Sequence, residues 1–383
     1  MGSLTVRGLT ARYGKKVALH GLDLDVADGE FFVILGPSGA GKTTTLKSIA
    51  GLVDSVSGQV RIAGRDMAGV EPYDRNVAMA FESYALYPQK TVEQNLASPL
   101  RSGRTGRYTA AEQADRISAV TRTLGIDHLL ARFPRELSNG QRQRTALGRV
   151  LVRPAEVYLL DEPLSHLDAK LRAAMRAELK QLGEMSRTTT LYVTHDYQEA
   201  LALGDRVGVL REGRLVQVGP PESVWDQPVD TFVARMFGQP EINLFDATVE
   251  RGVASWAGVT VGVPDGSPEA VRLGIRPRDL ALVSGVAPEN KLVLRGKVTL
   301  AERLGRLVEL SVDVAGESVI AVTADQRVGE GDQVTLAVDW ARVHVFGAER
   351  SASGTSIDTA VEDGARIGAA RPVSAEVPTG GTR

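Results

Sequence analysis

Short apolar runs alternate with longer amphipathic stretches over residues 4–215. Buried strands are predicted at 31–35, 157–160 and 189–194, because each is a compact run followed by polar or glycine-rich residues and then a helix-like stretch. This rhythm predicts an α/β layer fold with a largely parallel sheet.

Two longer stretches, 110–124 and 168–184, carry apolar residues at helical spacing with charges of both signs between them. That pattern is typical of solvated helices that pack on one face. We expect these two helices to be structural.

The pattern changes to two-residue alternation after the segment FGQPEINL at 237–244. The turn GEGD at 329–332 leads into another alternating stretch, so this part of the chain predicts antiparallel β structure, a small barrel or sandwich. The last residues are rich in Ala, Gly, Ser, Thr and Pro without periodicity. We therefore expect a first domain at 1–238, a β-rich domain at 239–347 and a disordered tail at 348–383.

Composition narrows the class of protein. The 383 residues are 43% hydrophobic and 24% charged, which suits two folded domains, and the net charge of -2 gives no overall positive field to gather nucleic acid. The chain has no cysteine, which excludes disulfides, thiolate metal sites and a cysteine nucleophile. The amino terminus lacks a signal-peptide core and no apolar run approaches the length of a membrane span, so we expect a cytoplasmic protein that reaches a membrane only through a partner.

The predicted strand at 31–35 runs into GPSGAGKT, residues 36–43, and then into a helix-like stretch. This is the complete G-x-x-x-x-G-K-T pattern in its strand–loop–helix context. Its glycines let successive backbone N–H groups point at phosphate oxygens, with Lys42 reaching the β and γ phosphates and Thr43 offering a hydroxyl to Mg²⁺. The flanking elements make a chance glycine-rich turn the weaker interpretation, so the sequence predicts a nucleoside triphosphate site.

Two further segments carry candidate chemistry. VYLLDE ends with Asp161 and Glu162 at the carboxyl end of a predicted strand, where Asp161 is suited to hold Mg²⁺ and Glu162 to polarise a water that attacks the γ phosphate. In LSNGQ, Ser138 is a predicted helix N-cap, with Asn139 and Gly140 free to adopt unusual backbone angles, so this helix start is a second predicted anion site.

Five motifs stand in the order and approximate spacing of ATP-binding cassette (ABC) proteins: GPSGAGKT, LSNGQ, LLDE, the SHLD at 165–168 and the VTH that ends at His195. The chain resembles that family over most of its first 215 residues. The resemblance implies a P-loop NTPase cassette with a helical subdomain. LGIRPRDL at 273–280 and VHVFG at 343–347 make the β-rich region similar to the oligonucleotide-fold-like (TOBE-type) domain of importer ATPases of the maltose and sn-glycerol-3-phosphate type.

The family pattern also implies roles for individual residues. Two cassettes would dimerise head to tail around two ATP molecules, each placing its Ser138 loop on the γ phosphate bound by the other. His195 would bond the γ phosphate, Asp168 would lie at the dimer contact, and Tyr13 would stack on adenine. The expected nucleotide-binding residues are Tyr13, Gly36, Pro37, Ser38, Gly39, Ala40, Gly41, Lys42, Thr43, Thr44, Ser138, Asn139, Gly140, Gln141 and Asp168.

Two residues depart from the family pattern. Glu82 stands before SYALYP where the family usually has a glutamine that contacts Mg²⁺ and the attacking water. A glutamate keeps an oxygen ligand but adds negative charge near the γ phosphate. We therefore expect metal binding to persist, and the rate of ATP hydrolysis or its coupling to transport to change. Asn139 replaces a commoner glycine, a milder change because Asn tolerates left-handed geometry. The expected catalytic residues are Glu162, His195 and Glu82, and the expected Mg²⁺ ligands are Thr43, Glu82 and Asp161.

The resemblance implies the cytoplasmic, peripheral ATPase subunit of an importer, most simply for a sugar, oligosaccharide or polyol phosphate. Its implied partners are a second cassette, identical or related, two transmembrane permease subunits contacted through residues 82–96, and indirectly an extracellular solute-binding protein. An importer for polyamine, iron or an oxyanion, a slow-turnover regulator marked by Glu82, and a non-transport cassette acting on nucleic acid remain alternatives. The near-neutral net charge of the chain argues against a cassette that acts on nucleic acid.

Overall fold

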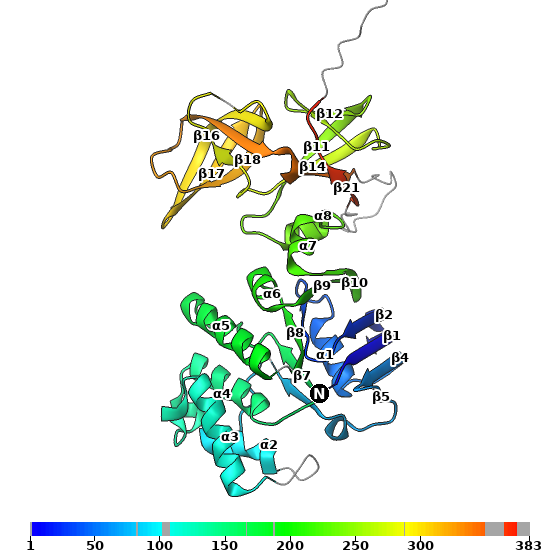
Figure 1. Cartoon of the computed structure of the whole chain (residues 1–383), viewed down its shortest axis with the longest axis vertical. Coiled ribbons are helices and arrows are strands. Elements are labelled where there is room, and N and C mark those ends of the chain that lie inside the picture. Colours follow the sequence, from blue (N-terminus) through cyan, green and yellow to red (C-terminus); the bar gives the residue numbers. More distant parts are fainter. Residues whose placement is uncertain are drawn as a thin grey trace, which may run out of the picture. The chain divides into compact units, whose positions relative to one another are not determined.

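The computed structural model of the chain describes residues 2–81, 83–101, 108–165, 167–186, 188–286, 288–348 and 364–373 (Figure 1). It divides into two compact units, Met1–Val224 and Trp225–Arg383, and each unit has a hydrophobic core of its own. In the described part of the chain, no helix combines the length and the apolar character needed to cross a membrane.

The first unit is organised by a six-stranded sheet with the order β10-β9-β3-β8-β7-β6. All neighbours pair in parallel except the hairpin of β9 and β10, which confirms the predicted parallel sheet. The three predicted strands are present, and β3, β7 and β8 are buried at every position, as expected when both faces of a parallel sheet are covered. The strands are β3 (Phe31–Leu35), β6 (Val77–Ala80), β7 (Val157–Asp161), β8 (Thr189–Thr194), β9 (Arg206–Arg211) and β10 (Arg214–Gly219).

A second sheet of the first unit is antiparallel, with the order β2-β1-β4-β5. One core joins it to the parallel sheet and to helix α1, because apolar residues of all three elements pack in the same cluster. The phosphate-loop helix is thus held between two sheets. The elements are β1 (Leu4–Tyr13), β2 (Lys16–Val26), α1 (Lys42–Ala50), β4 (Ser55–Ile62) and β5 (Arg65–Asp66).

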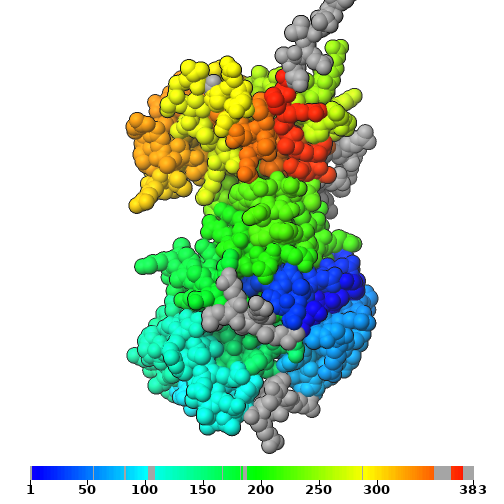
Figure 2. All heavy atoms as spheres, viewed as in Figure 1, coloured from blue at the N-terminus to red at the C-terminus, as the bar shows by residue number. Residues whose placement is uncertain are grey.

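Three helices of the first unit group together, away from the antiparallel sheet (Figures 1 and 2). A β-carbon on Gly148 would lie 3.0 Å from Leu96 Cδ2 and 3.1 Å from Leu124 Cδ1, so glycine allows α4 to approach its neighbours closely. This group is the helical subdomain that the sequence predicted. The helices are α2 (Val92–Arg101), α3 (Ala110–Thr123) and α4 (Asn139–Leu151), and α5 (Ala169–Ser186) and α6 (Tyr197–Leu203) accompany the parallel sheet.

The second unit contains helix α8, the end of α7, which spans the boundary, and two antiparallel sheets, as the two-residue alternation predicted for its β structure. Inward-facing residues of both sheets form one core, in which the rings of Phe245 and Trp256 stack with centroids 3.9 Å apart. The first sheet has the order β13-β12-β11-β14-β20-β21 and the second β15-β19-β16-β17-β18. The elements are α7 (Pro221–Asp226), α8 (Thr231–Met236), β11 (Asn243–Glu250), β12 (Val253–Trp256), β13 (Val259–Gly262), β14 (Ala270–Ile275), β15 (Ala281–Leu282), β16 (Lys291–Leu304), β17 (Leu307–Val314), β18 (Glu317–Thr323), β19 (Gln333–Asp339), β20 (Val343–Gly347) and β21 (Arg366–Ala369).

The structure divides the chain earlier than the boundary expected at 238/239, because a buried arginine ties the α8 region to the β sheets. Arg276 is 3% exposed and donates hydrogen bonds to the carbonyl oxygens of Trp225, Ala234 and Phe237. Its guanidinium carbon also lies 4.1 Å from the centroid of the Trp225 ring. These contacts make residues 225–238 part of the second unit.

The tail contains a strand where the sequence analysis expected disorder throughout 348–383. β21 pairs antiparallel with β20 and extends its sheet, and Ile367 packs against the core of the unit. The sequence analysis missed this strand because it has only four residues, too few to show the alternation of apolar and polar positions that is typical of a strand. The rest of the expected tail, 349–363 and 374–383, lies outside the described residues.

Candidate functional site

The phosphate loop connects the fully buried strand β3 to α1. Gly41 caps the helix with a φ of 108°, and a β-carbon there would lie 2.8 Å from the Ala18 carbonyl oxygen, so only glycine fits. Lys42 turns back over the loop, where its Nζ donates to the carbonyl oxygens of Gly36 at 2.9 Å and Pro37 at 3.0 Å. The Lys42 ammonium is therefore held against the loop by two backbone carbonyls.

Five side chains from the ends of three elements meet beside this loop. Lys42 Nζ lies 3.2 Å from Glu162 Oε1, and His195 Nδ1 lies 2.6 Å from Glu162 Oε2. Thr43 Oγ1 donates to Asp161 Oδ1 at 3.0 Å. The structure thus brings together the lysine, the threonine, both carboxylates and the histidine that the sequence singled out, at the carboxyl ends of β7 and β8.

Glu162 has a backbone φ of 44°, in the left-handed region that side chains other than glycine rarely adopt. The cost of such a conformation is of order 1–3 kcal/mol, and it is retained only where the surroundings fix it. Here the Glu162 N–H donates to the Val193 carbonyl oxygen at 3.0 Å, and the carboxylate is held by Lys42 and His195. This fixes the carboxylate beside the phosphate loop.

A cleft of about 810 Å³ opens over these residues. Tyr13 lines it and is 49% exposed, which excludes the alternative that this tyrosine packs in the core. Five lining residues escaped the sequence analysis because no motif contains them: Lys16, Val17, Ala18, His20 and Glu212. The remaining lining residues are Ser38, Gly39, Gly41, Lys42, Thr43, Thr44, Glu162 and His195.

The predicted second anion site is a helix start, away from the residues that line this cleft. Ser138 caps α4 in a capping box: its hydroxyl accepts from the Gln141 N–H at 3.3 Å, and Gln141 Oε1 accepts from the Ser138 N–H at 2.9 Å. The hydroxyl proton can therefore still be donated to an anion. Asp168 Oδ1 accepts from the Leu171 N–H at 2.9 Å, at the start of α5.

The expected unusual backbone angles at Asn139 and Gly140 are wrong, because both residues belong to the first turn of α4. Asn139 is helical, so the tolerance of asparagine for left-handed geometry plays no part here. Gly140 is required for another reason: a β-carbon would lie 3.0 Å from Leu171 Cδ2. Glu82, expected to bind metal, lies outside the described residues.

A buried carboxylate supports the histidine end of the site. Glu199 on α6 is 2% exposed, and its Oε2 accepts from the hydroxyls of Tyr192 and Thr194, both at 2.7 Å. Burial raises the pKa of the Glu199 carboxyl, while the two hydroxyl hydrogen bonds oppose that shift. The network anchors the end of β8 from which His195 extends, and its only sequence signal would have been an acid within a predicted helix.

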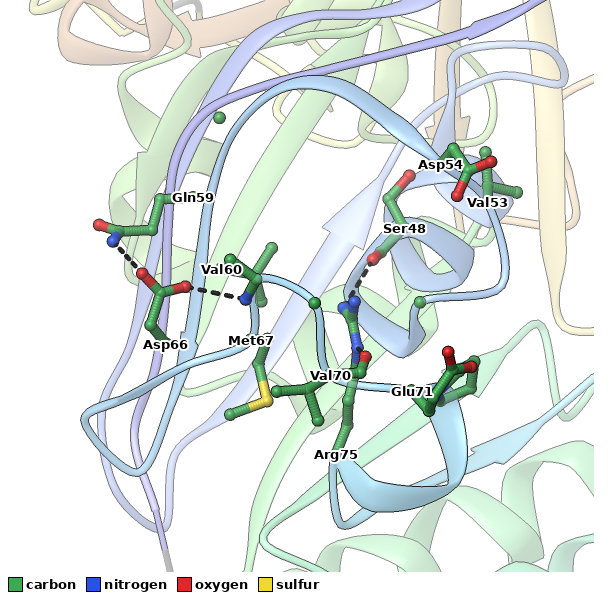
Figure 3. A pocket seen from close by; sticks show the side chains of 15 residues that line it. Ser48, Val53, Asp54, Gln59, Val60, Asp66, Met67, Val70, Glu71 and Arg75 are labelled. Carbon is green, nitrogen blue, oxygen red and sulfur yellow. Dashed lines mark hydrogen bonds between the residues drawn. The ribbon is translucent and has the colours of Figure 1, made fainter.

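A second hollow, of about 500 Å³, lies at the other end of α1 (Figure 3). Arg75 projects into it and closes the helix: its Nη1 donates to the carbonyl oxygens of Ile49 at 2.9 Å and Ser48 at 3.3 Å, and its Nε to that of Val70 at 2.9 Å. A β-carbon on Gly51 would lie 2.6 Å from Arg75 Cζ. This hollow thus surrounds a structural cap of the helix that begins in the nucleotide cleft.

Known proteins resemble both units. The ABC transporter family model matches residues 19–165, and the TOBE domain model matches residues 273–346. The trehalose/maltose import ATP-binding protein of Thermococcus litoralis is 42% identical over 354 residues, which cover 87% of this chain and 94% of that protein. The chain belongs to the ABC transporter family. The sn-glycerol-3-phosphate import ATP-binding protein of Rhizobium johnstonii is 40% identical over 357 residues, 91% of this chain and 95% of that protein.

Among solved structures, a dimeric bacterial ABC transporter cassette is 28% identical with a TM-score of 0.53, covering 57% of this chain and 98% of that one. A post-hydrolysis dimer of that cassette with bound ADP and phosphate matches equally well. The comparisons confirm the predicted fold, an ABC cassette followed by a TOBE domain. This ABC protein is an ATPase, and cassettes of its kind form dimers.

Gly213 supports the phosphate loop in this ABC ATPase, so replacing it should weaken nucleotide binding. With Glu212 it forms the two-residue turn between β9 and β10, and its N–H donates to the Ala40 carbonyl oxygen at 2.8 Å. In Gly213→Ala the new β-carbon would overlap the Ala18 carbonyl oxygen and lie 2.9 Å from Leu19 Cα. Strain of about 1–3 kcal/mol predicts roughly 5- to 150-fold weaker binding of a non-hydrolysable ATP analogue in calorimetry.

Gly64→Ala is the matched control, because Gly64 also has a positive φ in a two-residue turn, but no atom of the described residues lies within 4 Å of the added β-carbon. Its affinity for the analogue should equal that of the wild type. Equal affinities for all three proteins would contradict the assigned role of Gly213.

The buried Glu199 carboxyl should make stability depend on pH. Its pKa is raised in the folded state, so the folded protein binds more protons than the unfolded chain between the two pKa values. The stability contribution is therefore greatest below the ordinary glutamate pKa and falls as pH rises through the folded pKa. Urea unfolding of wild type and Glu199→Gln from pH 4 to 7.5 should show the wild type losing stability relative to the variant as pH rises; a constant difference would contradict this.

Proposed function

We propose that this chain is the ATP-hydrolysing subunit of an ABC importer for a carbohydrate, acting at the cytoplasmic face of the membrane. The observation that carries the hydrolytic part is the contact of Glu162 with both Lys42 and His195 beside the phosphate loop. The solute class is supported by the names of the relatives, which give trehalose, maltose, sn-glycerol-3-phosphate, xylose or α-glucosides as the transported solute.

ATP fits the cleft by its polar lining. The adenine would stack on exposed Tyr13, and the triphosphate would lie in the loop formed by Gly36, Pro37, Ser38, Gly39, Ala40 and Gly41, where backbone N–H groups and the positive end of α1 face it. Lys42 would exchange its contact with Glu162 for the β and γ phosphates, and Thr44 would complete the loop. That exchange leaves the Glu162 carboxylate free of its cation.

A hard divalent cation also fits, because Thr43 Oγ1 and Asp161 Oδ1 are two oxygen donors 3.0 Å apart at the edge of the cleft. We infer that these two residues hold Mg²⁺, with Glu82 as a third ligand. When bound, the ion would neutralise charge on the β and γ phosphates. Thr43 and Asp161 need not move far, since each is already placed by its own element.

Glu162 would act as the general base, accepting a proton from the water that attacks the γ phosphate while His195 hydrogen-bonds the phosphate. A second cassette would contact the same phosphate through its loop of Ser138, Asn139, Gly140 and Gln141. Its Asp168 would lie at the dimer contact. The exposed Ser138 hydroxyl and its fixed capping geometry support this assignment. Binding of ATP would thus close a dimer of cassettes, identical or related, and hydrolysis would reopen it.

Two transmembrane permease subunits would contact the cassettes through residues 82–96. The permeases in turn would bind an extracellular solute-binding protein, so that this chain interacts with it only indirectly. Within that segment Tyr87 is 43% exposed and Leu86 half-buried, a mixed apolar surface suited to a short partner helix. The permeases would hold the chain at the membrane, and closing of the cassette dimer would pull on them.

Glu162→Gln tests the hydrolytic assignment. Removing the base should lower steady-state Mg²⁺-dependent ATPase at least about 100-fold, since general-base catalysis contributes about 10²–10⁴-fold. ATP binding should persist, and the variant should accumulate as an ATP-bound dimer in size-exclusion chromatography. Retained turnover would refute the role of Glu162, and tight ATP binding without turnover in the wild type would instead indicate a regulator.

Deletion of the gene tests the solute class. Uptake of one labelled solute from the set of trehalose, maltose, sn-glycerol-3-phosphate, xylose and an α-glucoside should fail in the deletion strain and return with the wild type but not with Glu162→Gln. Loss of polyamine, iron or oxyanion uptake, with sugar uptake unchanged, would contradict a carbohydrate importer.

A further inference from the structure

The loop at 83–91 is held in a strained shape by side chains from two helices. Ala85 has a φ of 46°, a left-handed conformation that an alanine keeps only under constraint. Asn95 of α2, fully buried, accepts from the Tyr87 N–H at 2.8 Å and donates to the carbonyl oxygens of Tyr87, Lys90 and Thr91 at 3.0–3.1 Å. One side of the loop is therefore fixed to α2.

Arg149 of α4 fixes the other side. Its Nη1 donates to the Ala85 carbonyl oxygen at 2.6 Å, and its guanidinium carbon lies 5.2 Å from the centroid of the Tyr87 ring. Among the described residues Arg149 forms no ion pair with a carboxylate. A half-buried arginine that has no acidic partner in the described part of the chain and bonds instead to the carbonyl of a strained residue indicates a role in shaping the loop.

The same helix contacts the hydrolysis site. Gln143 on α4 donates to the carbonyl oxygen of Pro163, the residue after Glu162. Gln143 and Arg149 are separated by six positions, about 9 Å along a helix. Because Gly148 packs α4 closely against α2, a shift of this helix cannot be absorbed between the two. A continuous path thus runs from Glu162 through α4 to Ala85.

We propose that Arg149 is a positioning residue, through which helix α4 couples the segment at Glu162 to the shape of the loop that docks the permease. This inference rests on the proposed function, because it takes the segment 82–96 to be the docking site. Arg149 acts through Ala85 and Tyr87 and does not touch nucleotide. Losing it leaves hydrolysis intact in the isolated subunit and removes the influence of the permease on it.

The test compares Arg149→Gln with Arg116→Gln. Arg116 on α3 is a matched control, since its guanidinium also lies over a tyrosine ring, that of Tyr108 at 4.7 Å, but away from the loop. Mg²⁺-dependent ATPase is measured for each subunit alone and after assembly with its permease subunits in lipid nanodiscs. Hydrogen exchange of the amides of residues 84–91 is measured in parallel.

For Arg149→Gln we expect an isolated ATPase rate within twofold of the wild type and a ratio of assembled to isolated rates close to one. Amides in the loop should exchange about tenfold faster, while those of α1 and β3 are unchanged. Arg116→Gln should match the wild type throughout. Arg149→Lys should be intermediate, because one ammonium cannot hold the carbonyl and cover the ring as the planar guanidinium does.

Three results would overturn the inference. If assembly changes the rate of Arg149→Gln as much as that of the wild type, Arg149 does not couple the two sites and the proposed function is untouched. If the isolated rate and the melting temperature fall together, Arg149 serves folding only. If the wild type neither assembles with a permease nor changes rate on assembly, the proposed docking function itself fails.

Discussion

The contact of Lys42 with Glu162 is the interaction on which the site depends. An ammonium group has three protons to donate, and Lys42 places them on two loop carbonyls and this carboxylate. Its side chain is only 6% exposed, so an unpaired charge there would cost several kcal/mol. The same contact joins the start of α1 to the end of β7, and the bond of Glu162 with His195 adds the end of β8. Together they hold the carboxylate near the position where a phosphate would bind.

Helix α4 gives the site its second connection. Its first residues carry the capping box of Ser138, its middle contacts Pro163, and its last turn contacts the loop at 83–91. A rigid helix that contacts two other segments in this way converts a local change at one of them into a displacement at the other. The two glycines that bring α4 close to its neighbours, Gly140 and Gly148, make that rigidity possible.

The sequence predicted what depends on contiguous patterns. The strands at 31–35, 157–160 and 189–194 were found because full burial leaves uninterrupted apolar runs, and the phosphate loop because its chemistry lies in adjacent residues. Arg149 and Gly213 were missed because their partners, Ala85 and Ala40, are distant in the chain. Glu199 was missed because an acid within a helix does not by itself indicate a buried network. The backbone at Asn139 was misjudged because the composition of a helix start resembles that of a loop, whereas the capping box decides in favour of a helix.

The strand β21 limits how far the chain can be shortened from its carboxyl end without exposing a sheet edge. It covers the outer backbone groups of β20, whose residues Val343, Val345 and Phe346 are fully buried. Ending the protein at 347, just past the TOBE domain match at 273–346, would leave β20 as an edge strand whose unpaired amides and carbonyls favour pairing with another chain. β21 thus protects the edge of this sheet against intermolecular strand pairing and aggregation.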